Sequence, residues 1–361
     1  MHQINPVEYD HLLDIKINKL KKVFSYISLP VFEVYKSEPL NFRMRAEFRI
    51  WHDDGEVFYA MNNPDKKIPY MINEFPIGSK KINELMAPLL LEINKNNILK
   101  NKLFSAEFLT TLSDDVVVTL IYHKPVDENW KKEATNLHTK FMINIIGRSL
   151  KKKLIIGHDY VVEKLRIDGT DYHYKQIENG FTQPNAGINQ AMLSWTLRQT
   201  QKCEDDLLEL YCGNGNFTCV LSRNFKKVLA TEVSKASVKA AHFNLEKNNI
   251  GNVKICRMSS EEITSALNKV KKFRRLKNID LNTYKLNTIF VDPPRAGLDE
   301  KTLNLLKKFK NILYISCNPK TLQENIQEIS DTHSIKSFAV FDQFPYTDHL
   351  ECGVLLQLKN L

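Results

Sequence analysis

Residues 206–218 read Asp-Leu-Leu-Glu-Leu-Tyr-Cys-Gly-Asn-Gly-Asn-Phe-Thr, an apolar strand that runs into a glycine turn and then a helix. Further apolar strands alternate with helical stretches down to the end of the chain. This alternation predicts an α/β fold for residues 181–361, with a doubly wound parallel sheet covered by helices on both faces. The expected strands are 206–211, 228–233, 253–256, 286–291, 312–315 and 352–358.

The glycine turn lies where doubly wound sheets bind nucleotide-like ligands. Gly213 and Gly215 fill two of the three glycine positions of a dinucleotide motif, but Thr218 stands at the third. The turn therefore favours a nucleoside without phosphates over NAD. Glu232 ends the next strand, 19 residues after Gly213, where a carboxylate accepts hydrogen bonds from ribose hydroxyls. The set resembles the S-adenosylmethionine site of class I methyltransferases; the alternative is a tight turn beside a solvated acid.

Chemically useful side chains follow or precede three other strands. Asp292 begins an Asp-Pro-Pro-Arg segment, and its role, on substrate or on cofactor, stays open from the residues alone. Cys317 lies just before a helix that Pro319 can start, and a helix N-terminus lowers the pKa of a thiol. Glu351 enters the last strand, where burial would raise its pKa and make it a general base. Asp348 and His349 compete for that role.

A thiol, a base and a methyl donor at one sheet edge suit methylation of uracil at C5. That carbon is too weak a nucleophile until a thiolate adds at C6, and a base must then remove the C5 proton. Other readings of the same residues are a proline-stiffened loop at Asp292 and an exposed acid at Glu351.

Five segments in order resemble the RNA 5-methyluridine methyltransferase family: 181–185, 209–218, 290–297, 314–319 and 341–353. The first half resembles the bacterial branch that methylates uridine 54 in the T loop of tRNA, with the T-loop-like region of tmRNA as a further substrate. The resemblance implies that Cys317 is the nucleophile and Glu351 the proton acceptor. It implies that the residues that contact S-adenosylmethionine are Gln183, Tyr211, Asn216, Glu232 and Asp292.

Residues 1–180 are expected to form an α+β domain that recognises tRNA. Expected elements are a hairpin of strands 43–51 and 56–61, a helix over 80–97 that Pro88 kinks or splits, a hairpin of 102–111 and 116–123, and a helix over 128–145. Arg43, Arg45 and Arg49 share one strand face and are candidate phosphate contacts, or simply its solvated side. Trp51 or Phe104 can stack on a base, and Arg295 can hold a flipped nucleotide.

The 361 residues include 51 Lys and Arg against 42 Asp and Glu, a net charge of +9 that favours a polyanionic partner. All six cysteines lie at or beyond Cys203 without a C-x-x-C pair, so neither a metal nor an iron–sulfur cluster is expected. We expect a cytoplasmic monomer that contacts the T arm and no membrane. The alternatives are the same chemistry on ribosomal RNA, and an RNA-folding protein with secondary methylation.

Overall fold

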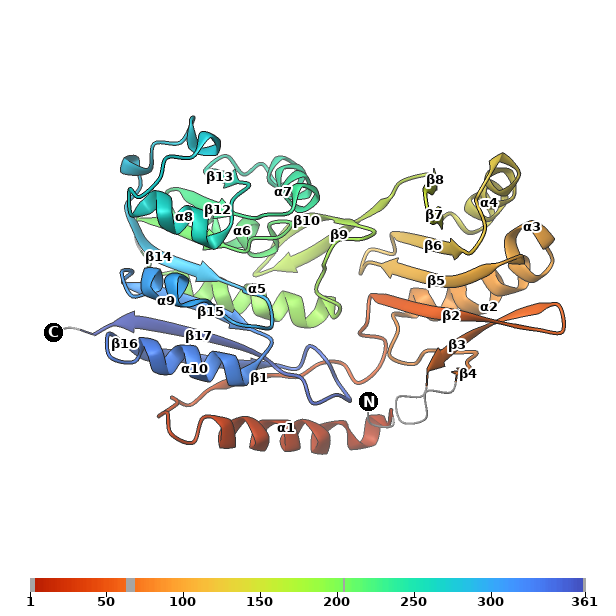
Figure 1. The fold of residues 1–361 in the computed structure, drawn as a ribbon. Coiled ribbons are helices and arrows are strands. Elements are labelled where there is room, and N and C mark those ends of the chain that lie inside the picture. Colours follow the sequence, from red (N-terminus) through yellow and green to blue (C-terminus); the bar gives the residue numbers. More distant parts are fainter. Residues whose placement is uncertain (1–3, 63–68, 204, 360–361) are drawn as a thin grey trace. The chain divides into compact units, whose positions relative to one another are not determined.

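The computed structural model describes residues 4–62, 69–203 and 205–359 (Figure 1). Its internal contacts divide the chain into two compact units. The N-terminal unit is built mainly from Glu38–Lys164 and Lys175–Ala186, and the C-terminal unit from Val7–Ser37, Leu165–Tyr174 and Gly187–Leu361. The N-terminal unit is thus inserted into the chain of the other. This division differs from a single boundary at residue 180, which stays a prediction about functional domains.

The C-terminal unit contains an eight-stranded sheet. Its strands are β1 (Glu33–Tyr35), β11 (Asp206–Leu210), β12 (Val228–Thr231), β13 (Val253–Cys256), β14 (Leu286–Val291), β15 (Asn311–Ser316), β16 (His333–Phe341) and β17 (Glu351–Leu358). They lie in the order β1-β16-β17-β15-β14-β11-β12-β13. All neighbours are parallel except that β17 runs antiparallel to β15 and β16. The predicted α/β sheet is confirmed, and every residue of β11 is buried.

Helices cover both faces of this sheet. They are α1 (Tyr9–Val23), α5 (Ala186–Thr200), α6 (Asn216–Leu221), α7 (Lys235–Lys247), α8 (Ser260–Leu267), α9 (Glu300–Leu306) and α10 (Pro319–Ile329). Helices α6 and α7 connect β11 to β12 and β12 to β13, which takes the chain toward one edge of the sheet. Helices α8, α9 and α10 lead to β14, β15 and β16, which takes the chain toward the other edge. Right-handed crossovers therefore put these two groups on opposite faces. Helix α1 packs beside α10, and α9 lies between α10 and α8 (Figure 1).

Two strands of this sheet are absent from the sequence prediction. The segment before residue 351 contains β16, where no strand was expected, and residues 33–35 form β1, which pairs with the outer edge of β16. The first half of β16 is polar and only partly buried, so it lacks the apolar run that marks the other strands. Strand β1 has three residues, too few to show any period.

The N-terminal unit holds a seven-stranded sheet. Its strands are β2 (Arg45–Asp53), β3 (Glu56–Asn62), β4 (Pro69–Met71), β5 (Leu103–Thr110), β6 (Val116–Tyr122), β7 (Asn144–Ser149) and β8 (Lys152–Ile156). The order is β4-β3-β2-β5-β6-β7-β8, antiparallel except for the β6–β7 pair, and both predicted hairpins are confirmed. Its helices are α2 (Lys80–Asn94), α3 (Asn97–Lys100) and α4 (Glu128–Phe141).

Two helix predictions in this unit need correction. Helix α2, capped by the Ser79 side chain, continues unsplit through Pro88 and ends at Asn94, short of the expected residue 97. The helix expected to reach residue 145 ends at Phe141, because Met142 takes a left-handed conformation (φ 53°) and residues from 144 onward form β7.

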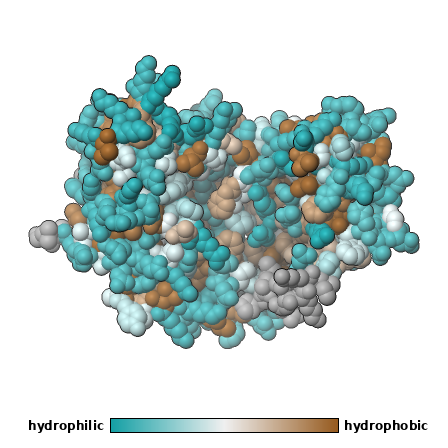
Figure 2. Space-filling view, viewed as in Figure 1, coloured by the Kyte–Doolittle hydropathy of each residue, from teal (hydrophilic) through white to brown (hydrophobic). Residues whose placement is uncertain are grey.

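A two-stranded hairpin of β9 (Tyr160–Ile167) and β10 (Thr170–Ile177) carries the chain between the units, its turn belonging to the C-terminal one. On the face seen in Figure 2, the surface is mostly hydrophilic with small separate apolar patches. Within the described ranges, no helix combines the length and apolar character of a bilayer crossing. Those ranges also contain no group of three or more His, Cys, Asp or Glu arranged to hold a metal ion.

Candidate active site

The turn between β11 and α6 is sharply bent. Tyr211, Gly213 and Gly215 all have positive φ, at 60°, 56° and 82°. This conformation costs glycine little but is strained for tyrosine, and such strain concentrates at functional sites. A Cβ added at Gly213 would meet no atom within 4 Å, so the chain faces open space there. The turn is thus shaped to bring backbone close to a ligand, as its two glycines predict.

Glu232 lies against this turn. One of its carboxylate oxygens accepts a hydrogen bond from the Gly213 N–H at 3.0 Å, and the other accepts from the Ser234 N–H at 2.7 Å. The carboxylate therefore joins the loop after β12 to the loop after β11. The structure brings Glu232 and the glycine turn together, as their spacing predicts.

Tyr211 and Asn216 are held by residues that the sequence did not single out. The Tyr211 hydroxyl donates to Ser260 Oγ at 2.9 Å. The side-chain amides of Asn216 and Asn189 bond each other reciprocally, at 2.8 and 3.0 Å, and the Tyr174 hydroxyl donates to the Asn216 carbonyl. An asparagine on α5 and a tyrosine on β10 give no local signal of these contacts, because their partner is far along the chain.

Three acidic side chains lie at or near the carboxyl edge of the central strands. Burial raises the pKa of Asp292, which follows β14, to about 7. Burial and then the Asp292 charge raise the pKa of Glu351 to about 8. Glu209, fully buried within β11, also has its pKa raised to about 8 by burial. Near neutral pH, burial and mutual repulsion therefore disfavour the state in which all three groups are ionised.

Glu209 lies in segment 209–218, which resembles the methyltransferase motif, but it is not among the predicted cofactor contacts. Neither of its carboxylate oxygens has a hydrogen-bond partner within the described ranges, and the Thr218 hydroxyl nearby makes no bond of normal geometry. Its signal in the sequence is an acid between Leu208 and Leu210 in a fully buried strand. A buried carboxyl without a hydrogen-bond partner costs free energy, and a polar or cationic ligand bound beside the glycine turn would reduce this cost.

Cys317 and Glu351 face each other across two strands. Ser316, the last residue of β15, pairs with Cys352 in the antiparallel β15–β17 ladder, so Cys317, which follows β15, and Glu351, which begins β17, lie at the same end of the ladder. Cys317 is half-buried and Glu351 is buried. The same edge carries Asp292, because Val291 pairs with Tyr314 of β15. The structure thus places Cys317, Glu351 and Asp292 at one edge of the sheet.

The electrostatic prediction for Cys317 is wrong in sign. Helix α10 begins at Pro319 as expected, with the Asn318 side chain capping it. Burial, followed by the charges of Glu351 and Asp292, nevertheless raises the pKa of the thiol to about 11, and Arg295 offsets only part of this. One short helix end is outweighed by two carboxylates in a low-dielectric site. The resting residue is a thiol and not a thiolate.

The two competitors of Glu351 point elsewhere. Asp348 is exposed and forms an ion pair with Lys19 at 2.6 Å. His349 is exposed, its ring nitrogen Nδ1 lies 3.5 Å from an Arg295 guanidinium nitrogen, and burial together with Arg295 lowers its pKa. Arg295 itself is exposed, and its carbonyl accepts a bond from Asn318. Arg295 and His349 therefore form a polar pair at the solvent side of the edge.

The remaining predicted residues belong to the N-terminal unit. Gln183 lies there, in the segment between β10 and α5. Arg43 donates to the Arg45 carbonyl, and Arg45 donates to the Glu178 carbonyl at 2.7 Å, so both guanidinium groups are engaged within the chain. Arg49, in contrast to these two partly buried arginines, is exposed to solvent.

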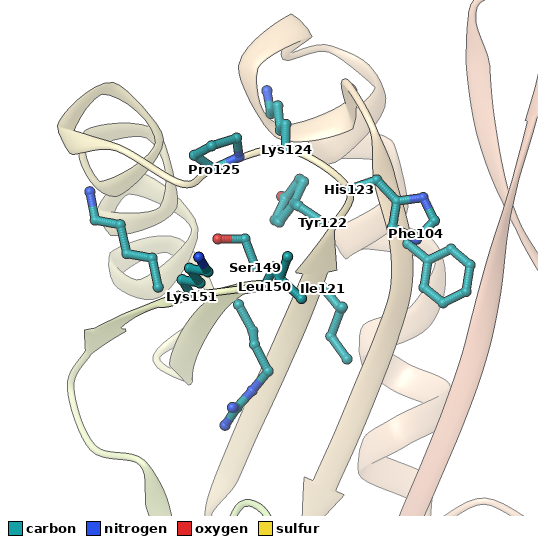
Figure 3. Close-up of a pocket in the computed structure, with 11 residues that line it drawn as sticks. Phe104, Ile121, Tyr122, His123, Lys124, Pro125, Ser149, Leu150 and Lys151 are labelled. Carbon is teal, nitrogen blue, oxygen red and sulfur yellow. The ribbon is translucent and has the colours of Figure 1, made fainter.

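An aromatic stack accompanies Arg49. Its guanidinium carbon lies 5.8 Å from the centroid of the Phe104 ring, and that ring stacks on His123 with centroids 4.3 Å apart. The two rings line a pocket of 910 Å³, and Figure 3 shows them side by side, with Lys151 on the opposite side. Lys152 also lines this pocket. None of the predicted catalytic or cofactor residues lines this pocket.

Residues 8–359 match the family described as tRNA (uracil-5-)-methyltransferase. The chain is 52% identical over 351 residues to the tRNA/tmRNA (uracil-C(5))-methyltransferase of Cellvibrio japonicus, with 97% of this chain and 96% of that protein covered. It is 54% identical over 359 residues to the Saccharophagus degradans protein of the same name, covering 99% and 98%. The crystal structure of Pyrococcus abyssi tRNA (uracil-54, C5)-methyltransferase with S-adenosyl-L-homocysteine superposes with a TM-score of 0.73 at 22% identity, covering 96% of this chain and 83% of that one.

Proposed function

Because the chain belongs to the tRNA (uracil-5-)-methyltransferase family, it transfers a methyl group from S-adenosylmethionine to C5 of a uracil in tRNA, and we propose that its target is uridine 54 of the T loop. The names of its relatives add tmRNA, and we include the T-loop-like region of that RNA. The shared fold of the Pyrococcus abyssi enzyme supports the choice of uridine 54.

The residues around the glycine turn fit S-adenosylmethionine. Open space in front of Gly213, the Glu232 carboxylate at the turn and the unsatisfied Glu209 carboxyl suit a nucleoside with a positive charge. We assign cofactor contacts to Tyr211, Asn216, Glu232 and Asp292, and to Gln183 from the family motif. When bound, the cofactor supplies an electrophilic methyl group and a cationic sulfur that lowers the pKa of acidic groups around it.

The two remaining groups divide the covalent chemistry between them. The Cys317 thiol first gives its proton to water, and the thiolate sulfur adds to C6 of the ring while the electron pair of the C5–C6 double bond moves between C5 and C4 and the negative charge passes to O4. C5 of that enolate takes the methyl group as the bond between the methyl carbon and the donor sulfur breaks, which leaves S-adenosylhomocysteine. Glu351 then accepts the C5 proton, the double bond re-forms, and Cys317 leaves as a thiolate. Burial suits Glu351 to this task, because its raised pKa lets it hold the proton once taken.

The observation that carries this assignment is the pairing of Ser316 with Cys352 in the β15–β17 ladder, because it puts the adjacent residues Cys317 and Glu351 at the same sheet edge. The test uses a T-arm RNA with 5-fluorouridine at position 54, because fluorine cannot leave as a proton does and the protein–RNA bond persists. Wild type should form an adduct that survives denaturing electrophoresis, and Cys317→Ala should form none and methylate nothing. Cys317→Ala with normal activity would overturn the nucleophile.

Glu351→Gln tests the base on ordinary RNA. Methyl transfer should occur once per enzyme and leave a covalent, methylated RNA that does not release. Absence of trapped RNA would count against Glu351. Cys352→Ala is the matched control for Cys317, since Cys352 is a buried cysteine on the neighbouring strand.

Two alternatives are outcomes of the same experiments. Labelled methyl groups appearing in purified ribosomal RNA and not in tRNA would move the substrate to the ribosome. A Cys317→Ala protein that still binds tRNA and meets every cellular requirement would make methylation secondary to RNA folding.

We propose that residues 1–180 recognise the T arm. The exposed Arg49 over the Phe104–His123 stack offers a charge for a phosphate and a ring face for an unpaired base. Arg295 is a second candidate, beside the catalytic edge, for holding the flipped uridine. We assign the protein to the cytoplasm and expect a monomer, because one chain supplies every residue the reaction needs.

A further inference from the structure

One buried lysine ties the first helix of the C-terminal unit to the loop before Glu351. Lys16 lies on α1 and is 5% exposed. Its ammonium donates to Asp342 Oδ1 at 2.6 Å, to the Phe344 carbonyl at 2.8 Å and to the His349 carbonyl at 3.0 Å. An ammonium has three N–H donors, and here all three are used.

The three acceptors span one loop. Residues 342–350 connect β16 to β17, and Phe341 pairs with Glu351 where the loop starts and ends. Asp342 and Phe344 lie in its entry, and His349 lies two residues before Glu351. A single ammonium therefore binds both ends of the loop and restrains the point where β17 begins.

The buried ion pair of Lys16 and Asp342 is an inefficient way to stabilise the fold. Removing a lysine and an aspartate from water costs more than their attraction commonly returns, and apolar side chains would pack here at less cost. Burial does lower the pKa of Lys16, with Asp342 opposing the change. Tyr346, in the middle of the loop, is buried and has a positive φ of 61°, so the loop holds a strained shape that its surroundings must maintain.

A neighbouring lysine shows the contrast. Lys19 lies one turn further along α1 and pairs with Asp348 of the same loop at 2.6 Å. Its side chain and that of Asp348 are 60% and 66% exposed, so water competes for both charges and the pair restrains little. Of these two lysines, Lys16 is the one that is buried and donates hydrogen bonds to backbone carbonyls of the loop.

We propose that Lys16 is a positioning residue for the proton-transfer step, fixing loop 342–350 so that Glu351 stands against Cys317. The inference rests on the proposed role of Glu351. Cysteine addition and methyl transfer do not use Glu351, so loosening the loop slows only the removal of the C5 proton. Covalent, methylated RNA then accumulates on the enzyme.

The test compares three variants with wild type on ordinary tRNA. Lys16→Met combined with Asp342→Asn removes both buried charges, so that neither is left unpaired. Lys16→Arg keeps the charge, but a planar guanidinium does not direct donors to these three acceptors. Lys19→Met is the control. The measurements are kcat, KM for S-adenosylmethionine, the melting curve and the fraction of enzyme covalently bound to RNA after rapid denaturation.

Both Lys16 variants should lower kcat by about 10- to 100-fold, the effect expected of a displacement near 1 Å at a reacting group, and should raise the covalent fraction. The KM for S-adenosylmethionine should stay as in wild type, and Lys19→Met should match wild type throughout. If the double variant does not fold, Lys16→Arg alone decides.

A folded Lys16 variant with the wild-type covalent fraction overturns the proposal, whether or not its kcat is lowered. Glu351→Gln in the same assay distinguishes a failure of the proposed base from a failure of the proposed role of Lys16. If Glu351→Gln traps no RNA, the proposed base fails; if it traps RNA and the Lys16 variants do not, only the role of Lys16 fails.

Discussion

Replacing Glu351 by Gln should stabilise the folded protein at alkaline pH while it removes activity. The side chain is 5% exposed, and its pKa is raised from 4.5 to about 8 by burial and by Asp292. A carboxyl whose pKa is raised by folding prefers its neutral form in the folded state. Its favourable contribution is complete below the unfolded pKa and is lost as pH rises through the folded pKa of about 8. Glutamine keeps the shape and cannot ionise.

The size of the effect follows from the shift. A change of 3.5 units, from 4.5 to about 8, corresponds to about 5 kcal/mol at 1.36 kcal/mol per unit, as an upper bound for one group. Most of it comes from burial, and a smaller part comes from the charge of Asp292. Near pH 5 both proteins carry a neutral group here, and their stabilities should agree.

Urea unfolding of both proteins at about pH 5 and about pH 9, followed by circular dichroism, measures this difference, since the unfolding midpoint reports stability. The exposed Glu328 on α10 provides the control, and Glu328→Gln should follow wild type at both pH values. The reasoning is refuted if Glu351→Gln is no more stable than wild type near pH 9, or if its gain is the same at both pH values.

Three further outcomes are expected. Glu232→Gln should raise the KM for S-adenosylmethionine by about 10-fold or more with kcat largely kept, because a hydrogen bond to a charged group is worth about 1.5–3 kcal/mol; an unchanged KM would contradict the ribose assignment. Gly353→Ala should lower the free energy of unfolding by about 1–3 kcal/mol, measured by urea unfolding, since its Cβ would lie 2.7 Å from the Trp195 ring; an unchanged free energy would show that α5 can shift to make room. Arg49→Ala should weaken tRNA binding and lower the salt dependence by about one phosphate contact, as filter binding at several salt concentrations measures; an unchanged slope would place the phosphate elsewhere.

The central sheet and its edge were within reach of sequence reasoning because their signals are local. Strand β11 is fully buried and carries three leucines with Asp206 and Glu209, and the turn after it needs glycine for its backbone angles. Cys317 and Glu351 stand directly at strand ends, so the strand order alone brings them to one edge. Local pattern and tertiary placement agree at these points.

Residues defined by distant partners were out of reach. Arg43, Arg45 and Arg49 have the same period-two spacing, yet only Arg49 stays exposed, because the other two bond backbone carbonyls that no local rule predicts. Lys16 looks like any surface lysine of an amphipathic helix until the loop 326 residues away is placed beside it. The predicted pKa of Cys317 was wrong for the same reason, since the burial that raises it most and the carboxylates of Glu351 and Asp292 that add to it depend on other parts of the fold.

Strand β1 is the outer neighbour of β16, and 298 residues separate Tyr35 from His333. A ribosome adding about 5–20 residues per second needs roughly 15–60 s to make that stretch. Through this interval α1 and β1 have been synthesised but lack α10 and β16, on which they pack. Residues 7–37 of the nascent chain therefore carry a short edge strand and an amphipathic helix without their native partners for a long period, which favours non-native association.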